Sequence, residues 1–220
     1  MINIQKPNNL FGLEKNENNL YSYSPNVLSF LEYMANTWFY VAENKTVLEI
    51  GPGTGWFTHT LLHCKIKHIT CVERYANFYN ELVHLFSNNK NTSIVHDDIY
   101  YYLSHNKPKF NVVVALGVVY HFTDPIGLLE KIVNYCEPEY ILLDSPDGPL
   151  NIVDEPGNPG DRQNEDGFVS SNITITVPID LLKTVLEKYG YQLIKQEDIG
   201  YFGIVSKEQS HVLMFQKCST

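Results

Sequence analysis

The fold is decided by the stretch Val47-Leu48-Glu49-Ile50-Gly51-Pro52-Gly53-Thr54-Gly55, in which a short apolar run leads straight into three glycines. The run Thr46–Ile50 has the length and composition of a buried strand, and a helical pattern over Trp56–Cys64 follows the glycines. Glycines at such a turn let the backbone bend sharply and approach a ligand closely. The N-terminus of the following helix presents unpaired N–H groups to an anionic group. The stretch therefore predicts a strand–turn–helix unit that binds either a pyrophosphate or a carboxylate.

Strand-like and helix-like segments alternate along the rest of the chain. Helices are expected through Phe78–Phe86, from Pro125 after the capping residues Thr123 and Asp124, and over Ile179–Tyr189. Further strands are expected at His68–Glu73, Ser93–His96, Phe110–Leu116, Glu139–Asp144, Tyr191–Ile194 and His211–Phe215, the last two as an antiparallel closing pair. This alternation predicts an α/β fold with a doubly wound, mostly parallel, seven-stranded sheet.

The sequence pattern divides the chain into an N-terminal part and a main domain. Residues 1–42 combine a polar, asparagine-rich segment with an amphipathic cap helix over Pro25–Val41, and residues 43–220 form the main domain. Within this domain, residues 146–167 are rich in Gly, Pro, Asp and Asn and predict a long loop. A loop of this length in a compact domain is commonly functional or disordered.

Composition and charge bound the possible partners. With 220 residues, 44% hydrophobic and 19% charged, the chain has the size and composition of one globular domain. The formal net charge is -9, and the few, dispersed Lys and Arg residues argue against a nucleic-acid partner. Neither a membrane-spanning apolar run nor an export signal is evident, so we expect a cytoplasmic protein without a membrane partner. The four scattered cysteines predict neither a disulfide framework nor a metal site.

Two details of the glycine turn favour a ligand with an amino group over a dinucleotide. The third glycine follows the second after one residue, whereas the dinucleotide fingerprint Gly-x-Gly-x-x-Gly needs two. Glu49 lies two residues before Gly51, where a carboxylate suits an ammonium group and would repel a pyrophosphate. Both details disfavour a nicotinamide-dependent oxidoreductase. The absence of a lysine after the turn excludes a phosphate loop.

The segment Val47–Gly55 closely resembles the first motif of the class I S-adenosylmethionine-dependent methyltransferases. The resemblance extends roughly from residue 41 to the C-terminus and implies a Rossmann-like methyltransferase fold. It implies that S-adenosylmethionine is the cofactor and that Glu49 helps to hold the cofactor's amino group. It also implies that the methionine part of the cofactor meets the three glycines of the turn, Gly51, Gly53 and Gly55.

Two further acids extend the predicted cofactor site. Glu73 ends the second strand, and an acid about 20 residues after the glycines commonly grips ribose hydroxyls; the alternative is a surface glutamate paired with Arg74. The family resemblance implies that Asp98 accepts a hydrogen bond from the adenine amino group and that the backbone N–H of Ile99 meets the adenine ring. The alternative for Asp98 is helix capping. Leu116, at the end of the fourth strand, completes the predicted cofactor contacts.

The acceptor is expected beyond the fourth strand, because ligands of open α/β sheets lie at the carboxyl ends of the strands. His121 is either a general base for the acceptor or a packed histidine. Tyr120 either orients the acceptor or fills the core. The predicted function is transfer of a methyl group to O or N of a small molecule. Residues 146–167 are then either an acidic lid or a solvated loop, and the oligomeric state stays open.

A second resemblance supplies the alternative function. The stretch Leu116–His121, together with Gly160-Asp161-Arg162, resembles an enzyme that modifies the wobble uridine of tRNA with a carboxylated form of the cofactor. The alternatives are therefore a tRNA-modifying enzyme that uses S-adenosylmethionine or a carboxylated derivative of it, and a non-catalytic module that only binds the cofactor.

Overall fold

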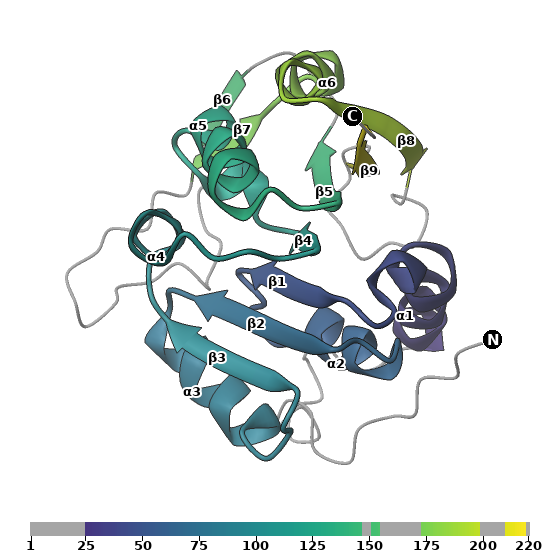
Figure 1. Cartoon of the computed structure of the whole chain (residues 1–220), viewed down its shortest axis with the longest axis vertical. Helices are drawn as coiled ribbons and strands as arrows, with labels where there is room; N and C mark the ends of the chain where they lie inside the picture. Colours follow the sequence, from purple (N-terminus) through teal and green to yellow (C-terminus); the bar gives the residue numbers. More distant parts are fainter. Residues whose placement is uncertain (1–24, 147–150, 155–172, 199–209, 219–220) are drawn as a thin grey trace.

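A seven-stranded sheet forms the centre of the computed structural model, which describes residues 25–146, 151–154, 173–198 and 210–218. The strands are β1 (Thr46–Ile50), β2 (His68–Glu73), β3 (Thr92–His96), β4 (Val112–Ala115), β5 (Tyr140–Pro146), β8 (Tyr191–Asp198) and β9 (Ser210–Lys217). Their order across the sheet is β3-β2-β1-β4-β5-β9-β8 (Figure 1). The first five run parallel, and β9 is antiparallel to both of its neighbours. The predicted fold class is confirmed, including the antiparallel closing pair.

Helices cover both faces of this sheet, because its central strands are apolar on both sides. The helices are α1 (Pro25–Thr37), α2 (Trp56–His63), α3 (Ala76–Phe86), α4 (Ile99–Asn106), α5 (Pro125–Lys131) and α6 (Ile179–Lys188). One core cluster joins α1 and α2 to the sheet around the fully buried Met34 and Trp38, and a second joins α4, α5 and α6 to the other face. A smaller cluster of Leu82 and Phe86 packs α3 near Trp56 of α2.

Several predicted boundaries differ from the structure by a few residues, and two of the differences change an element. The cap helix ends at Thr37, and the chain continues as a short 3-10 turn over Phe39–Ala42 instead of reaching Val41 in one helix. Residues 151–154 of the predicted loop 146–167 form strand β6 (Asn151–Asp154), which pairs antiparallel with β7 (Ile173–Thr176). The predicted positions 1–24, 147–150 and 155–167 lie outside the described residues. Among the helices that the structure describes, none is both long enough and apolar enough to cross a membrane.

Candidate functional site

The glycine turn after β1 adopts a backbone that only glycine accepts easily. Gly51, Gly53 and Gly55 have φ values of 60°, 53° and 79°. A Cβ on Gly51 would lie 2.7 Å from Val118 Cγ2, and one on Gly55 would lie 2.8 Å from a ring carbon of Phe86. A Cβ on Gly53 would meet nothing within 4 Å. The outer two glycines are therefore fixed by packing, whereas the space beside Gly53 is open.

Glu73 joins the end of β2 to the glycine turn. Its Oε2 accepts from the Gly53 amide at 3.0 Å and its Oε1 accepts from the Tyr75 amide at 2.8 Å. The side chain is buried, and this burial raises the pKa of the carboxyl group although the backbone donors act in the opposite direction. A buried acid is thus held at the carboxyl end of β2, one strand away from the turn.

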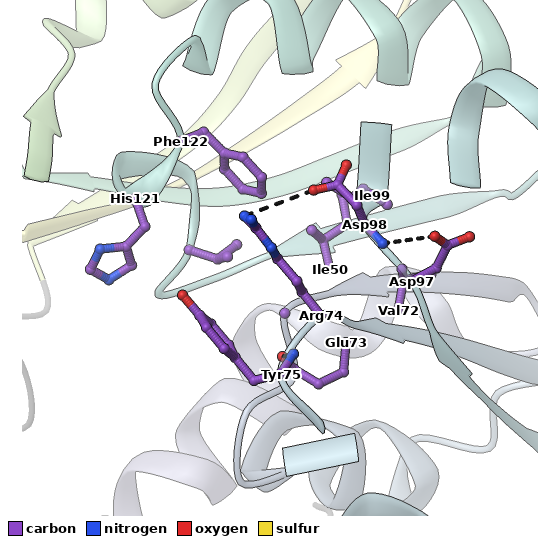
Figure 2. A pocket seen from close by; sticks show the side chains of 12 residues that line it. Ile50, Val72, Glu73, Arg74, Tyr75, Asp97, Asp98, Ile99, His121 and Phe122 are labelled. Carbon is purple, nitrogen blue, oxygen red and sulfur yellow. Dashed lines mark hydrogen bonds and ion pairs between the residues drawn. The ribbon is translucent and has the colours of Figure 1, made fainter. Parts of the chain in front are cut away.

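A pocket opens where β1, β2, β3 and β4 end. Its lining consists of Ile50, Gly51, Val72, Glu73, Arg74, Tyr75, Asp97, Asp98, Ile99, Val118, His121 and Phe122 (Figure 2). Five of the predicted site residues, Gly51, Glu73, Asp98, Ile99 and His121, therefore meet in one cavity although they come from four different strand ends.

Asp98 caps helix α4 while it faces this pocket. Its Oδ1 accepts from the amides of Tyr100 at 2.9 Å and Tyr101 at 3.4 Å, which is the capping arrangement that the sequence left open. Its Oδ2 lies 3.9 Å from Nη1 of Arg74, which reaches across the pocket from the end of β2 (Figure 2). Both side chains are more than a third exposed, so this ion pair costs little to break. A ligand can therefore displace Arg74 from Asp98 without disturbing the helix cap.

Glu49 and Leu116 are buried beneath the site and do not line the pocket. Thr58 Oγ1 donates to Glu49 Oε2 at 2.6 Å, and Cys71 Sγ donates to the same oxygen at 3.5 Å. Burial, reinforced by the nearby Glu73, raises the pKa of Glu49 to about 7. Glu49 therefore ties β1 to α2 and β2, and its role toward a cofactor amino group stays a prediction.

The turn after β4 carries the predicted acceptor residues. Gly117 has a φ of 72°, and a 3-10 turn over Val119–His121 follows it. His121 lines the pocket, and its ring centroid lies 4.4 Å from that of Tyr120. Tyr120 is partly buried and is not part of the lining. We call residues 117–121 the acceptor turn.

The sequence analysis missed seven of the twelve lining residues and the buried Asp144. Arg74, Tyr75 and Phe122 line the pocket, and the first two could have been found because they directly follow Glu73 at a strand end. Asp144 is buried at the end of β5, where its Oδ1 accepts from the Gly117 amide at 2.7 Å. The sequence did contain an indication of Asp144, because it is a polar residue near the end of an apolar strand, at the edge of the sheet where ligands bind.

The residues of the pocket fit an adenosine group. Ile50 and Val72 provide apolar contact for a planar ring, and Glu73 and Asp98 provide acceptors for hydroxyl and amino hydrogens. Gly53, beside which the space is open, is not itself part of the pocket lining. The roles of Glu73 toward the ribose and of Asp98 toward the adenine stay predictions.

The comparison with protein families decides which group of proteins this site belongs to. A family model described as ribosomal RNA adenine dimethylase matches residues 31–148, which is more than half of the chain. The chain belongs to the ribosomal RNA adenine dimethylase family. Membership in this family confirms the predicted class, the S-adenosylmethionine-dependent methyltransferases, and the predicted cofactor. The matched residues include the glycine turn, Glu73, Asp98 and the acceptor turn.

Individual relatives agree with this assignment. The chain is 36% identical over 125 residues to ribosomal RNA small subunit methyltransferase A of Prochlorococcus marinus, covering 53% of this chain and 44% of the relative. It is 32% identical over 110 residues to tRNA U34 carboxymethyltransferase of Nautilia profundicola, covering 47% of this chain and 35% of the relative. The chain thus spans less than half the length of these curated relatives.

The fold also agrees with solved methyltransferase structures. Magnesium protoporphyrin IX methyltransferase (ChlM) from Synechocystis PCC 6803, solved with bound SAH, superimposes with a TM-score of 0.60 at 11% identity. The superposition covers 88% of this chain and 83% of that chain. At this identity the similarity shows a shared fold and no more.

The comparisons overturn the predicted small-molecule acceptor and the predicted exclusion of nucleic acid. The family model and the Prochlorococcus relative are both named for ribosomal RNA, and the Nautilia relative is named for tRNA. The exclusion was wrong because a net charge of -9 is a sum over the whole surface and does not report the charge beside one pocket. The lining of this pocket combines Arg74 and His121 with three acids, Glu73, Asp97 and Asp98, so its charge does not decide the class of acceptor either.

Proposed function

We propose that this protein transfers a methyl group from S-adenosylmethionine to a base nitrogen of RNA. The observation that supports the proposal is the family match over residues 31–148, because it spans both the glycine turn and the acceptor turn. One continuous segment of the chain thus supports both RNA as the methyl acceptor and S-adenosylmethionine as the cofactor. An RNA substrate of this kind is also compatible with the predicted cytoplasmic location, which stays part of the proposal.

On the cofactor side, the chain offers a distinct group to each part of S-adenosylmethionine. Glu73 would accept hydrogen bonds from the ribose hydroxyls, and Asp98 would accept one from the adenine amino group in place of its ion pair with Arg74. The first turn of α4, which begins at Ile99, presents its backbone N–H groups to the ring. The bound cofactor would supply a methyl group that is carried on a positively charged sulfur. After the transfer, this sulfur is part of an uncharged thioether.

On the acceptor side, aromatic residues suit a planar base. Phe122 lines the pocket, and Tyr100 supports it in a T-shaped contact with ring centroids 5.6 Å apart. The Tyr100 hydroxyl donates to the Asp124 carbonyl at 2.7 Å, which fixes this ring at the start of α5. A base that stacks on Phe122 brings its amino nitrogen to the pocket.

The transfer itself requires alignment and the loss of one proton. The bond between carbon and sulfur breaks as the bond between nitrogen and carbon forms, and the electron pair of the broken bond stays on sulfur. The methylated nitrogen then releases one proton, which the His121 imidazole on the pocket wall can accept. Most of the rate comes from holding nitrogen, carbon and sulfur in line.

A radiolabel assay tests the proposal. The protein is incubated with S-adenosylmethionine carrying a tritiated methyl group and with unmethylated small-subunit ribosomal RNA, either protein-free or in ribosomal particles. We expect label in the RNA at an adenine, and much less with Glu73→Ala as the cofactor-site control. An absence of label in every RNA, under conditions where the protein binds the cofactor, would refute the proposal and favour a non-catalytic binding module.

Modification of tRNA is the second candidate, favoured by the match to the Nautilia tRNA U34 carboxymethyltransferase. The match agrees with the resemblance of Leu116–His121 to such an enzyme; Gly160-Asp161-Arg162 lies outside the described residues. The same assay separates the two candidates when bulk tRNA replaces ribosomal RNA and the carboxylated derivative of S-adenosylmethionine is supplied beside the methyl donor, with mass spectrometry to identify the transferred group. A carboxymethyl group on a wobble uridine, without adenine methylation, would establish the second candidate.

A further inference from the structure

Asp144 is a buried acid that the proposed reaction has not yet used. It is the first residue of β5 beyond the pairing of Leu143 with Ala115 on β4, and on its other side it pairs with Val212 of β9. The side chain is 4% exposed. Its carboxylate therefore lies inside the carboxyl edge of the sheet, where ligands of this fold class bind.

The carboxylate anchors the first residue of the acceptor turn. Asp144 Oδ1 accepts from the Gly117 amide at 2.7 Å, and Gly117 has the left-handed φ of 72° that starts the turn. The turn then closes on itself, because the His121 amide donates to the Val118 carbonyl at 3.0 Å. A Cβ on Gly117 would lie 4.0 Å from the Tyr120 hydroxyl, so the anchored residue and the tyrosine face each other.

A buried carboxylate in this position carries a large desolvation cost. Among the residues that the structure describes, no cation pairs with Asp144, and burial raises its pKa to about 7. A neutral acceptor could satisfy the same N–H group at a lower desolvation cost. A strong, charge-assisted hydrogen bond is shorter and more directional than a neutral one, which suits a contact that must fix a geometry.

We propose that Asp144 is a positioning residue for methyl transfer, whose carboxylate holds the Gly117 amide and thereby sets Tyr120 and His121 against the acceptor. The proposal rests on the proposed function. Its chemical role is limited to orientation: Asp144 touches neither the methyl group nor the acceptor. Since a displacement of about 1 Å costs roughly a hundredfold in rate, one lost anchor has a measurable effect.

The test compares Asp144→Ala with Asp144→Asn, which keeps an oxygen acceptor for the Gly117 amide. We expect the alanine variant to lose about ten- to a hundredfold in kcat toward RNA, with the dissociation constant of S-adenosylmethionine unchanged by calorimetry. The asparagine variant should regain part of kcat, because it keeps the oxygen acceptor for the Gly117 amide and loses the charge. Asp180→Ala, at an exposed acid of α6 whose side chain is 94% exposed, is the matched control and should behave as the wild type.

Each other outcome overturns the proposal. An unchanged kcat in Asp144→Ala means that the anchor is not needed, and an equal loss in both variants means that an oxygen acceptor for the Gly117 amide is not what orients the acceptor turn. Loss of cofactor binding means that Asp144 serves the cofactor site instead.

Amide hydrogen exchange gives a readout that does not depend on activity. Exchange at Gly117 should be faster in Asp144→Ala than in the wild type and in Asp144→Asn. If the wild type modifies no RNA, the proposed function fails, and exchange still decides whether the anchor exists. If Asp144→Ala does not fold, Asp144→Ser, which keeps a polar side chain too short for the contact, takes its place.

Discussion

Replacing Glu49 with glutamine should change how the stability of the protein depends on pH. Burial raises the pKa of Glu49 from 4.5 to about 7, so the folded chain holds a proton here that the unfolded chain releases. Below about pH 4.5 both states are protonated and the stabilisation is fully present. It is lost as the pH rises toward 7, because only the unfolded state then ionises freely. The size of the loss is about 3 kcal/mol.

Glutamine suits this test because it keeps the local hydrogen bonds. Thr58 and Cys71 both donate to Oε2 of Glu49, so the amide oxygen of a glutamine can accept both while the group stays uncharged. The variant should therefore be about as stable as the wild type near pH 4.5 and about 3 kcal/mol more stable near pH 8.5. Asp144, whose pKa burial also raises to about 7, contributes a loss of the same sign in both proteins.

Urea unfolding of the free protein at several pH values, followed by circular dichroism, measures this difference. Glu130→Gln, at an exposed position of α5, is the matched control and should follow the wild-type curve. The reasoning is wrong if the stability difference between Glu49→Gln and the wild type is the same at pH 5 as at pH 8.5.

Three further predictions concern the site. Gly51→Ala should weaken S-adenosylmethionine binding at least tenfold in calorimetry, because the new Cβ would lie 2.7 Å from Val118 Cγ2. Adding Val118→Ala should restore part of the affinity. If it restores none, the steric argument is contradicted. Glu73→Ala should weaken cofactor binding at least several-fold by the same measurement, and an unchanged affinity would refute its ribose role. His121→Asn should leave cofactor affinity unchanged but lower the transfer rate and flatten its dependence on pH between about 6 and 8; a wild-type profile would leave His121 a packing role only.

The fold could be predicted from the sequence because its signals are local. Thr46–Ile50 contains three apolar residues and ends at glycines, so both the strand and the turn are visible in a few consecutive residues. Glu73 was found for the same reason, since it ends a strand at a regular distance from that turn. Strand β6 was missed because its four residues lie in a Gly- and Pro-rich stretch and pair with a segment that starts at Ile173.

The site could be predicted only in part, because some of its residues depend on side-chain direction. Phe122 lines the pocket through the path of its side chain, and sequence spacing does not encode that path. Asp144 was not recognised because a polar residue at a strand end is equally common at a surface. Glu49 was placed correctly along the chain, but its burial depends on Thr58 of α2 and Cys71 of β2 coming together in the fold.

Gly51 and Val118 bring the glycine turn and the acceptor turn close together, so the cofactor half and the acceptor half of the site pack against each other. Gly51 has no side chain where Val118 of the acceptor turn packs against it, so no side chain separates the two backbones and a movement of one turn would displace the other. If occupancy of one half changes the affinity of the other, thermodynamic linkage makes the change equal in both directions. An RNA that strengthens the binding of S-adenosylmethionine would then itself bind less tightly when the cofactor is absent.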